Sequence, residues 1–306
     1  MTRTELDESS WHQFSHGAFV NGRPVWYVDA GSGPTIVLLH GAGATWRAWL
    51  ANLVDLTRDH RVIAIDLPGF GDSANMPWSR DLAPYAAAVV GLLDQLDAHS
   101  PTIVGHSFGG LVAQRVASQL VARCSGLVLV GALGIGASRA RRLELATSFS
   151  IVRLLIHPRA VARFLASRPA IVDPLLGAGV HNPARVPREL VVPLRSGFAA
   201  ATGWWRAMLA GILDQFPQNA DAPGCPTLLL WGESDRLATL AMGRALAAAI
   251  PGAELECWPG VGHNMMLEKP DEFGDRLRRF VQANAPASST GSNTQSQRKF
   301  HRGAPR

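Results

Sequence analysis

The sequence of 306 residues has little cysteine, and this scarcity excludes two kinds of stabilising site. Its three cysteines, Cys124, Cys225 and Cys257, are odd in number and far apart. They form no Cys-x-x-Cys pair or Cys/His cluster, so the sequence indicates neither a disulfide framework nor a zinc site. We expect the three thiols to be buried as small apolar side chains, and we expect no metal ion.

Long hydrophobic runs are also missing. Apolar segments such as residues 126–131 have the length of a strand and are too short to span a bilayer. Residues 1–10 carry acidic side chains and no apolar stretch, so they do not have the pattern of a secretory signal. These absences predict a cytoplasmic protein without an integral membrane segment.

Charged residues make up only 17% of the chain, whereas hydrophobic residues make up 47%, which is typical of a globular protein with a sizeable core. Residues 285–306 form a polar, low-complexity tail that cannot bury a core, and we expect it to be disordered. Most of the net charge of +5 comes from four residues of this tail, so no nucleic-acid partner is needed to explain it. The four are Arg298, Lys299, Arg302 and Arg306.

Two stretches, residues 1–133 and 218–284, alternate apolar strand-like runs with helix-like segments. A run that is apolar at every position indicates a strand covered on both faces, and the alternation predicts an open α/β sheet. We expect strands at 35–39, 61–65, 101–104, 127–130, 226–231 and 253–258, with a hairpin over 19–28. We expect helices at 85–98, 109–122, 242–250 and 273–282.

The alternation lapses over residues 134–217, where the sequence indicates helices separated by prolines, at 141–156, 158–167 and 200–216. The strand pattern resumes afterwards. We therefore expect this segment to be a helical cap inserted between two strands of one sheet, with residues 1–133 and 218–284 as the core. The identity of the substrate would depend on this cap.

Ser107 is the candidate nucleophile, because residues 105–109 read Gly-His-Ser-Phe-Gly and match the pattern G-x-S-x-G. The motif follows a strand-like run and precedes a helix-like one, which is the context it requires. Such a turn holds the serine in a strained backbone conformation, and its tightness leaves no room for side chains at the two glycines. An ordinary turn is the alternative interpretation.

A serine hydroxyl is a weak nucleophile and needs a base within hydrogen-bonding reach. Among the ten histidines, His263 alone combines a glycine-rich loop with a position after the last strand-like run. The base in turn needs a carboxylate that fixes its tautomer. Asp235, in the loop after the strand at 226–231, is the first choice, and Glu233 is the second.

Two backbone amides are candidates for an oxyanion hole, the group of donors that stabilises negative charge on the substrate oxygen. One is the N–H of Phe108, directly after the nucleophile. The other is the N–H of Ala42, in the loop after the first parallel strand. The small neighbour Gly41 would let the substrate approach this backbone closely.

Five motifs, taken together, resemble the α/β-hydrolase superfamily over roughly residues 17–283. They are His40-Gly41, the segment Asp66–Gly71, the serine motif, the segment Gly232–Asp235, and Gly262-His263. The resemblance implies a mostly parallel, eight-stranded sheet flanked by helices, with a helical cap after the sixth strand. It also implies a structural role for Asp66 in shaping a loop, and no cofactor.

The resemblance narrows the chemistry without fixing the substrate. Ser107 argues against the relatives that open epoxides or displace halide with an aspartate nucleophile. Epoxide hydrolases also use tyrosines of the cap, and neither of the two tyrosines of this chain lies in the expected cap. The primary interpretation is a hydrolase of small apolar carboxylic esters or related acyl substrates, working through an acyl-enzyme. The serine motif and residues 131–136 also resemble the meta-cleavage-product hydrolases, which cleave carbon–carbon bonds.

Other possibilities remain open. A cofactor-free haloperoxidase or perhydrolase, an acyltransferase and a non-catalytic ligand-binding protein share this fold, since fold does not determine function. Trp204 and Trp205 are candidate substrate-binding residues, with ordinary amphipathic packing as the alternative. The sequence does not distinguish a monomer from a homodimer.

Overall fold

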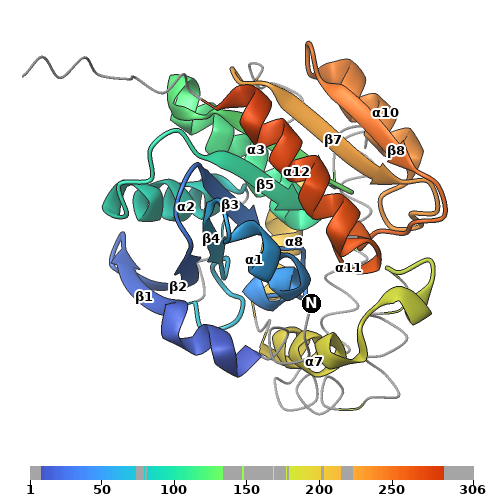
Figure 1. Ribbon diagram of the computed structural model, residues 1–306. Helices are drawn as coiled ribbons and strands as arrows, with labels where there is room; N and C mark the ends of the chain where they lie inside the picture. Colours follow the sequence, from blue (N-terminus) through green and yellow to red (C-terminus); the bar gives the residue numbers. More distant parts are fainter. Residues whose placement is uncertain are drawn as a thin grey trace, which may run out of the picture.

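The computed structural model describes residues 8–73, 79, 81–133, 147, 168, 177, 179–200, 203–214 and 223–285 (Figure 1). Most of the expected cap at 134–217 and nearly all of the expected disordered tail lie outside these residues. The helices expected at 141–156 and 158–167 lie outside them too. The division into core and cap therefore stays a prediction.

One sheet of eight strands forms the centre of the described chain, in the order β1-β2-β4-β3-β5-β6-β7-β8. β1 and β2 form an antiparallel hairpin, β2 is antiparallel to β4, and all other neighbouring strands are parallel. This is the mostly parallel, eight-stranded sheet that we expected. The strands are Ser15–Val20, Arg23–Ala30, Thr35–Leu39, Arg61–Ile65, Thr102–His106, Gly126–Val130, Thr227–Gly232 and Glu254–Trp258.

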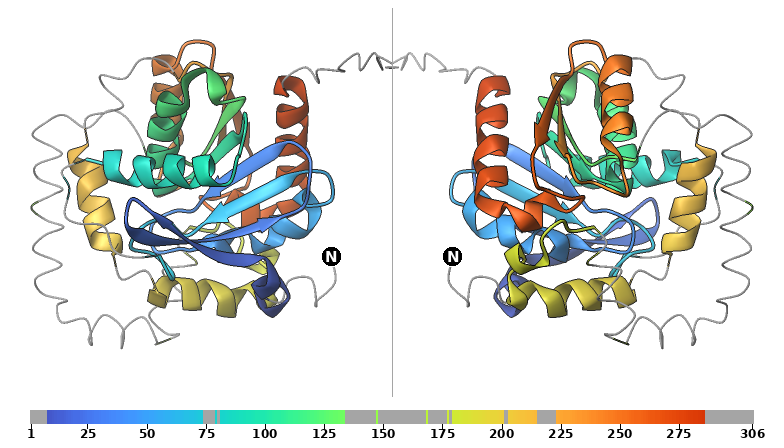
Figure 2. Two further views of the ribbon diagram at one scale, coloured as in Figure 1. Left: turned by 90° about the vertical axis from the view of Figure 1, so that its left-hand side faces the viewer. Right: turned by 90° about the vertical axis from the view of Figure 1, so that its right-hand side faces the viewer.

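Helices cover both faces of the sheet, because its parallel strands are apolar at nearly every position (Figure 2). One face packs against the helices α2 (Ala83–Gln95), α3 (Phe108–Leu120) and α10 (Leu240–Ala249). The other packs against α1 (Leu50–Leu56), α11 (Met265–Glu268) and α12 (Pro270–Asn284). All residues of β3, β5 and β6 are buried, as the apolar runs predicted.

Two differences from the expected elements have clear physical causes. The segment Trp46–Leu56 forms a short 3-10 helix and α1, where no helix was expected. Its residues are largely buried and apolar, so the sequence shows little contrast between a core face and a solvent face. α12 begins at Pro270 rather than at residue 273, because proline is well suited to the first turn of a helix.

The described part of the segment between β6 and β7 contains two longer helices, α7 (Val191–Ala200) and α8 (Trp204–Leu213). α8 agrees in place with the helix expected at 200–216. Asp214, at its C-terminal end, forms a partly buried ion pair with Arg115 of α3 and accepts a hydrogen bond from the Leu82 N–H. These contacts fix α8 to the sheet-covering helices. No helix in the described part of the chain has both the length and the hydropathy needed to cross a membrane.

The three cysteines are free thiols, but only Cys124 is fully buried. Cys225 and Cys257 are half-buried, so the expectation that all three would be buried was wrong. Cys257 lies on β8, which is an edge strand and is therefore covered by a neighbouring strand on one side only. The thiol of Cys225 donates a hydrogen bond to the sulfur of Cys124 at 3.3 Å, and the two form no disulfide.

Candidate active site

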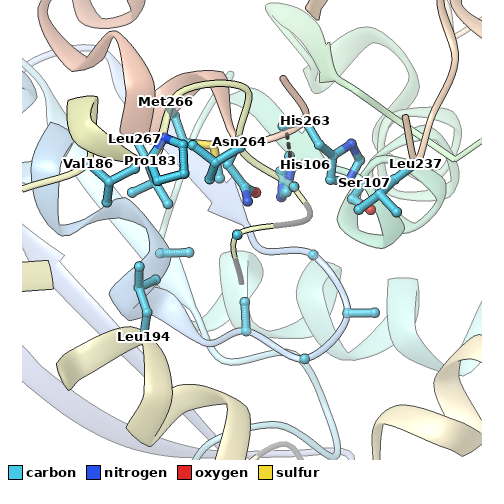
Figure 3. Close-up of a pocket in the computed structure, with 18 of the residues that line it drawn as sticks. His106, Ser107, Pro183, Val186, Leu194, Leu237, His263, Asn264, Met266 and Leu267 are labelled. Atoms are coloured by element: carbon cyan, nitrogen blue, oxygen red, sulfur yellow. Dashed lines mark hydrogen bonds between the residues drawn. The ribbon is translucent and has the colours of Figure 1, made fainter. Parts of the chain in front are cut away.

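The candidate site lies where the parallel strands of the sheet end, as is usual for ligand sites in α/β folds. A cavity of about 580 Å³ opens there, and both Ser107 and His263 line it (Figure 3). The loops after β3, β5, β6 and β8 all contribute to its wall. A cavity of this size can hold a small organic molecule.

Ser107 joins β5 to α3 in a left-handed backbone conformation, with φ 53° and ψ −117°. Its N–H donates to the carbonyl of Val130 at 2.9 Å, which secures the turn against β6. The flanking glycines are required by close approach of the backbone. A Cβ atom at Gly105 would lie 2.4 Å from the carbonyl oxygen of Gly109, and one at Gly109 would lie 2.3 Å from that of Leu39.

His263 and Asp235 form a buried pair behind the cavity. Nδ1 of His263 lies 2.7 Å from Oδ2 of Asp235. Because the carboxylate accepts, Nδ1 carries the hydrogen and Nε2 is left as an acceptor. The other oxygen, Oδ1, accepts from the N–H groups of Leu237 and Ala238, both at 2.8 Å, so the carboxylate is fixed in place. Glu233, the second choice, is exposed.

The loop after β3 contributes Gly41 and Ala42 to the cavity wall. The carbonyl of Gly41 accepts from Nδ1 of His40 at 2.8 Å and from the Ala44 N–H at 3.2 Å. In the same trans peptide the N–H of Ala42 points the opposite way, and both Gly41 and Ala42 line the cavity. Within the described chain, neither this N–H nor that of Phe108, at the start of α3, donates a hydrogen bond.

Two buried titratable groups support this loop from below. His40 donates from Nδ1 and accepts the N–H of Leu67 on Nε2 at 3.0 Å, and burial lowers its pKa to about 4. Asp66 accepts the N–H groups of Trp46 at 2.8 Å and Asp72 at 3.2 Å. Burial raises the pKa of Asp66 to about 7. These contacts agree with the loop-shaping role expected for Asp66.

His106, the residue before the candidate nucleophile, also lies at the site. Its ring lies 4.7 Å from the ring of His263 and lines the cavity. Nε2 donates to the backbone carbonyl of His263 at 3.1 Å, which Figure 3 marks with a dashed line. Burial, followed by the neighbouring His263, holds the pKa of His106 well below its usual range. Its Nδ1 has no hydrogen-bond partner in the described chain.

The two tryptophans expected to bind substrate are not among the described residues that line this cavity. α8 contributes Met208 instead, which lies one turn after Trp204. The side chain of Trp204 is partly exposed to solvent. The ring of Trp205 lies beneath the guanidinium of Arg206, with 5.4 Å between the ring centre and Cζ. Their location favours the alternative interpretation, amphipathic packing of α8.

Residues 179–194, within the segment on which we expected the substrate to depend, form part of the cavity wall, although no motif identified the individual residues. The polar side chains Arg188 and Asn264 also line the cavity. Asn264 follows His263 directly, and this adjacency was the one signal that could have identified it. The rest of the wall is mainly apolar and includes Val180, Val186, Leu194, Leu237, Met266 and Leu267.

Within the part of the chain that the structure describes, no three His, Cys, Asp or Glu side chains are grouped so as to hold a metal ion. The polar side chains that line the cavity are the hydroxyl of Ser107, the imidazoles of His106 and His263, the amide of Asn264 and the guanidinium of Arg188. Such a set can perform nucleophilic attack with proton transfer.

Comparison with known proteins places the chain in a family. The sequence pattern of the alpha/beta hydrolase family matches residues 36–276. An uncharacterised protein of Mycobacterium bovis is 31% identical over 269 residues, covering 84% of this chain and 78% of the relative. A 2-hydroxy-6-oxo-6-phenylhexa-2,4-dienoate hydrolase of Burkholderia cepacia is 29% identical, covering 91% of this chain and 99% of the relative. The structure of a thermophilic esterase from Thermogutta terrifontis shares the fold, with a TM-score of 0.73, 23% identity and coverage of 89% of this chain and 99% of the other. The chain belongs to the alpha/beta hydrolase family.

Proposed function

We propose that this protein is a serine hydrolase in which Ser107 is the nucleophile, His263 the base and Asp235 the residue that orients the base. The observation that carries the proposal is the buried pair of His263 and Asp235 at 2.7 Å, with His263 lining the same cavity as the strained Ser107. The tautomer fixed by this pair leaves Nε2 ready to accept a proton.

The reaction proceeds in two steps. The Ser107 oxygen attacks the carbonyl carbon of the substrate while its proton passes to Nε2 of His263. The amides of Ala42 and Phe108 stabilise the oxyanion, and collapse of this intermediate expels the alcohol, which takes the proton from His263. Water then attacks the acyl-enzyme with His263 again as base, which releases the acid and restores Ser107.

The substrate class we propose is a small, largely apolar carboxylic ester. The mainly apolar cavity wall supports this class, because such a surface binds alkyl or aryl groups without leaving polar groups unpaired. Residues 179–194 contribute part of this wall, which supports selection of the substrate by the segment at 134–217.

Hydrolysis of a carbon–carbon bond in a dienoate acid is the second candidate. One observation favours it: the guanidinium-bearing Arg188 lines the cavity, where it can neutralise a substrate carboxylate. The dienoate hydrolase of Burkholderia cepacia, which matches nearly the full chain, supports the same candidate. Both reactions use the same nucleophile and base, so they differ in the leaving group.

Labelling with a fluorophosphonate probe tests the nucleophile, and a substrate panel tests the class. We expect the probe to label Ser107 in the wild-type protein, and we expect Ser107→Ala to lower ester hydrolysis by about 10³-fold or more while the far-UV circular dichroism stays unchanged. Ser118→Ala, on the same helix, is the matched control and should retain full activity. Labelling that persists in Ser107→Ala, or unchanged turnover, contradicts the proposal.

The panel contains p-nitrophenyl esters of increasing chain length beside a 2-hydroxy-6-oxo-dienoate. Higher kcat/KM on the esters supports the ester class, and higher kcat/KM on the dienoate supports carbon–carbon cleavage. Transfer of the acyl group to an added alcohol in preference to water would instead indicate an acyltransferase. A protein that binds these molecules without turnover or labelling would be a non-catalytic member of the family.

A further inference from the structure

Glu268, at the end of α11, is a buried carboxylate for which the catalytic steps above give no role. Only 4% of its surface is exposed. Oε1 accepts the N–H of Gly262 at 2.8 Å and the N–H of His181 at 3.1 Å. Oε2 accepts the N–H of Asn182 at 3.0 Å. No Lys or Arg of the described residues forms an ion pair with it, so three backbone dipoles stabilise this carboxylate.

The three donors belong to two segments that are far apart in the sequence. Gly262 immediately precedes His263 in the loop after β8, and His181 and Asn182 belong to the segment between β6 and β7. A direct bond also joins the segments, since the N–H of Asn264 donates to the carbonyl of Gly179 at 2.8 Å. His263 therefore lies between two attachments to the same neighbouring segment.

The neighbouring segment is part of the cavity wall. Gly179, Val180 and Pro183 line the cavity on either side of the residues that Glu268 holds. Asn264, in the same loop as His263, lines it too (Figure 3). A substrate that pressed on this wall would therefore displace the backbone to which Glu268 is bonded. The hydrogen bonds of Glu268 connect that backbone to Gly262, the neighbour of His263.

We propose that Glu268 is a positioning residue that fixes the cavity wall at residues 179–182 to the loop carrying His263, so that the wall and the base keep one mutual placement. The inference rests on the proposed function in so far as His263 is the catalytic base. Positioning matters because a displacement of about 1 Å at a reacting group can reduce the rate on the order of 100-fold.

Glutamine cannot replace the carboxylate here. Both oxygens of Glu268 accept hydrogen bonds, whereas the amide nitrogen of glutamine only donates. In Glu268→Gln, at least one backbone N–H would face an N–H group and lose its buried partner. The substitution therefore weakens the connection between the two segments without any change in the size of the side chain.

The experiment compares Glu268→Gln with Glu272→Gln, which changes an exposed glutamate of α12 that pairs with Lys269. Active sites are counted by fluorophosphonate titration, and kcat and KM for a p-nitrophenyl ester are expressed per titrated site. We expect kcat per site to fall about 10- to 100-fold in Glu268→Gln, with a change in KM of less than about threefold. Glu272→Gln should match the wild type. If Glu268→Gln only reduces the number of titratable sites and leaves kcat per site unchanged, Glu268 has a merely structural role and the proposal is wrong.

Gly262→Ala tests the same connection with Glu268 intact, and it decides the matter if Glu268→Gln does not fold. A Cβ atom at Gly262 would lie 2.6 Å from the backbone nitrogen of His181, 3.0 Å from Oε1 of Glu268 and 3.1 Å from the carbonyl oxygen of Gly179. It therefore strains the connection although the carboxylate is still present. We expect a similar loss of kcat per site, and wild-type kcat in this variant would overturn the proposal. Failure of the proposed function itself would appear separately, as unlabelled Ser107 in the wild-type protein.

Discussion

Two groups of buried polar residues flank the nucleophile, and the protein holds them in different ways. Beneath the loop after β3, burial favours the uncharged forms, since it lowers the pKa of His40 to about 4 and raises that of Asp66 to about 7. Beyond β7 and β8, the carboxylates of Asp235 and Glu268 each accept three hydrogen bonds from the residues around them.

This difference separates two roles. His40 and Asp66 hold the backbone around the site, and we call them the frame. Asp235 and Glu268 act on the loop that carries His263, and we call them the chemical side. An uncharged His40 or Asp66 can hold backbone groups at little electrostatic cost, but it offers no charge to a transition state. A carboxylate surrounded by N–H donors is fixed in direction, and Asp235 can thereby stabilise the imidazolium that forms on His263. Changes beyond β7 and β8 should therefore affect turnover, and changes beneath β3 should affect how stability depends on pH.

Asp235→Asn gives the largest expected effect and tests the chemical side of the comparison. The amide would donate to Nδ1 of His263, which forces the hydrogen onto Nε2 and prevents proton transfer from Ser107. We expect kcat to fall by about 10³- to 10⁴-fold without loss of fold. The measurement is ester hydrolysis at neutral pH, with circular dichroism as the check on folding.

Glu233→Gln is the control for that prediction, because Glu233 is the exposed carboxylate of the same loop. It should change kcat by less than about threefold, within the range of a surface substitution. A larger loss in Glu233→Gln than in Asp235→Asn would assign the orienting role to Glu233. Asp235 would then not be the residue that orients His263.

The sequence was sufficient for features that depend on neighbouring residues. The apolar runs predicted the parallel strands because burial on both faces excludes polar side chains at every position. Gly105 and Gly109 marked the turn at Ser107 because close backbone contact on both sides leaves no room for a Cβ atom. Such constraints appear in a few consecutive residues.

Features that join distant segments could not be predicted in this way. Glu268 meets residues that lie more than 80 positions earlier, and His106 bonds to a carbonyl 157 positions later. Neither contact leaves a periodic pattern or a motif, because only the folded sheet brings those segments together. Trp204 was chosen for its residue type, but the geometry of α8 brings Met208 to the cavity instead.

Asp66→Asn gives the second-largest expected effect and tests the frame. Because its pKa is raised by folding, Asp66 contributes stability that is fully present below about pH 4 and is lost as the pH rises through about 7. The span of this effect is on the order of 4 kcal/mol in the free energy of unfolding. Asp66→Asn should remove this decline, measured as urea unfolding followed by tryptophan fluorescence from pH 4 to pH 8. Asp97→Asn, at an exposed site, should leave the decline intact.

His40→Gln has a smaller expected effect of the opposite sign. Folding lowers the pKa of His40, so its contribution to stability is fully present above about pH 6.5 and is lost as the pH falls towards 4. The span is on the order of 3 kcal/mol, and glutamine keeps one donor and one acceptor without titrating in this range. His99→Gln, at an exposed histidine, is the matched control.

The two contributions oppose each other between pH 4 and pH 6.5, so each becomes visible when the other is removed. The unfolding free energy of Asp66→Asn should rise with pH across this interval, because the contribution of His40 remains. That of His40→Gln should fall across the same interval, because the contribution of Asp66 remains. If the unfolding free energies of the two variants instead changed with pH in the same direction, burial would not hold His40 and Asp66 uncharged. The proposed difference between these two residues and Asp235 and Glu268 would then be wrong.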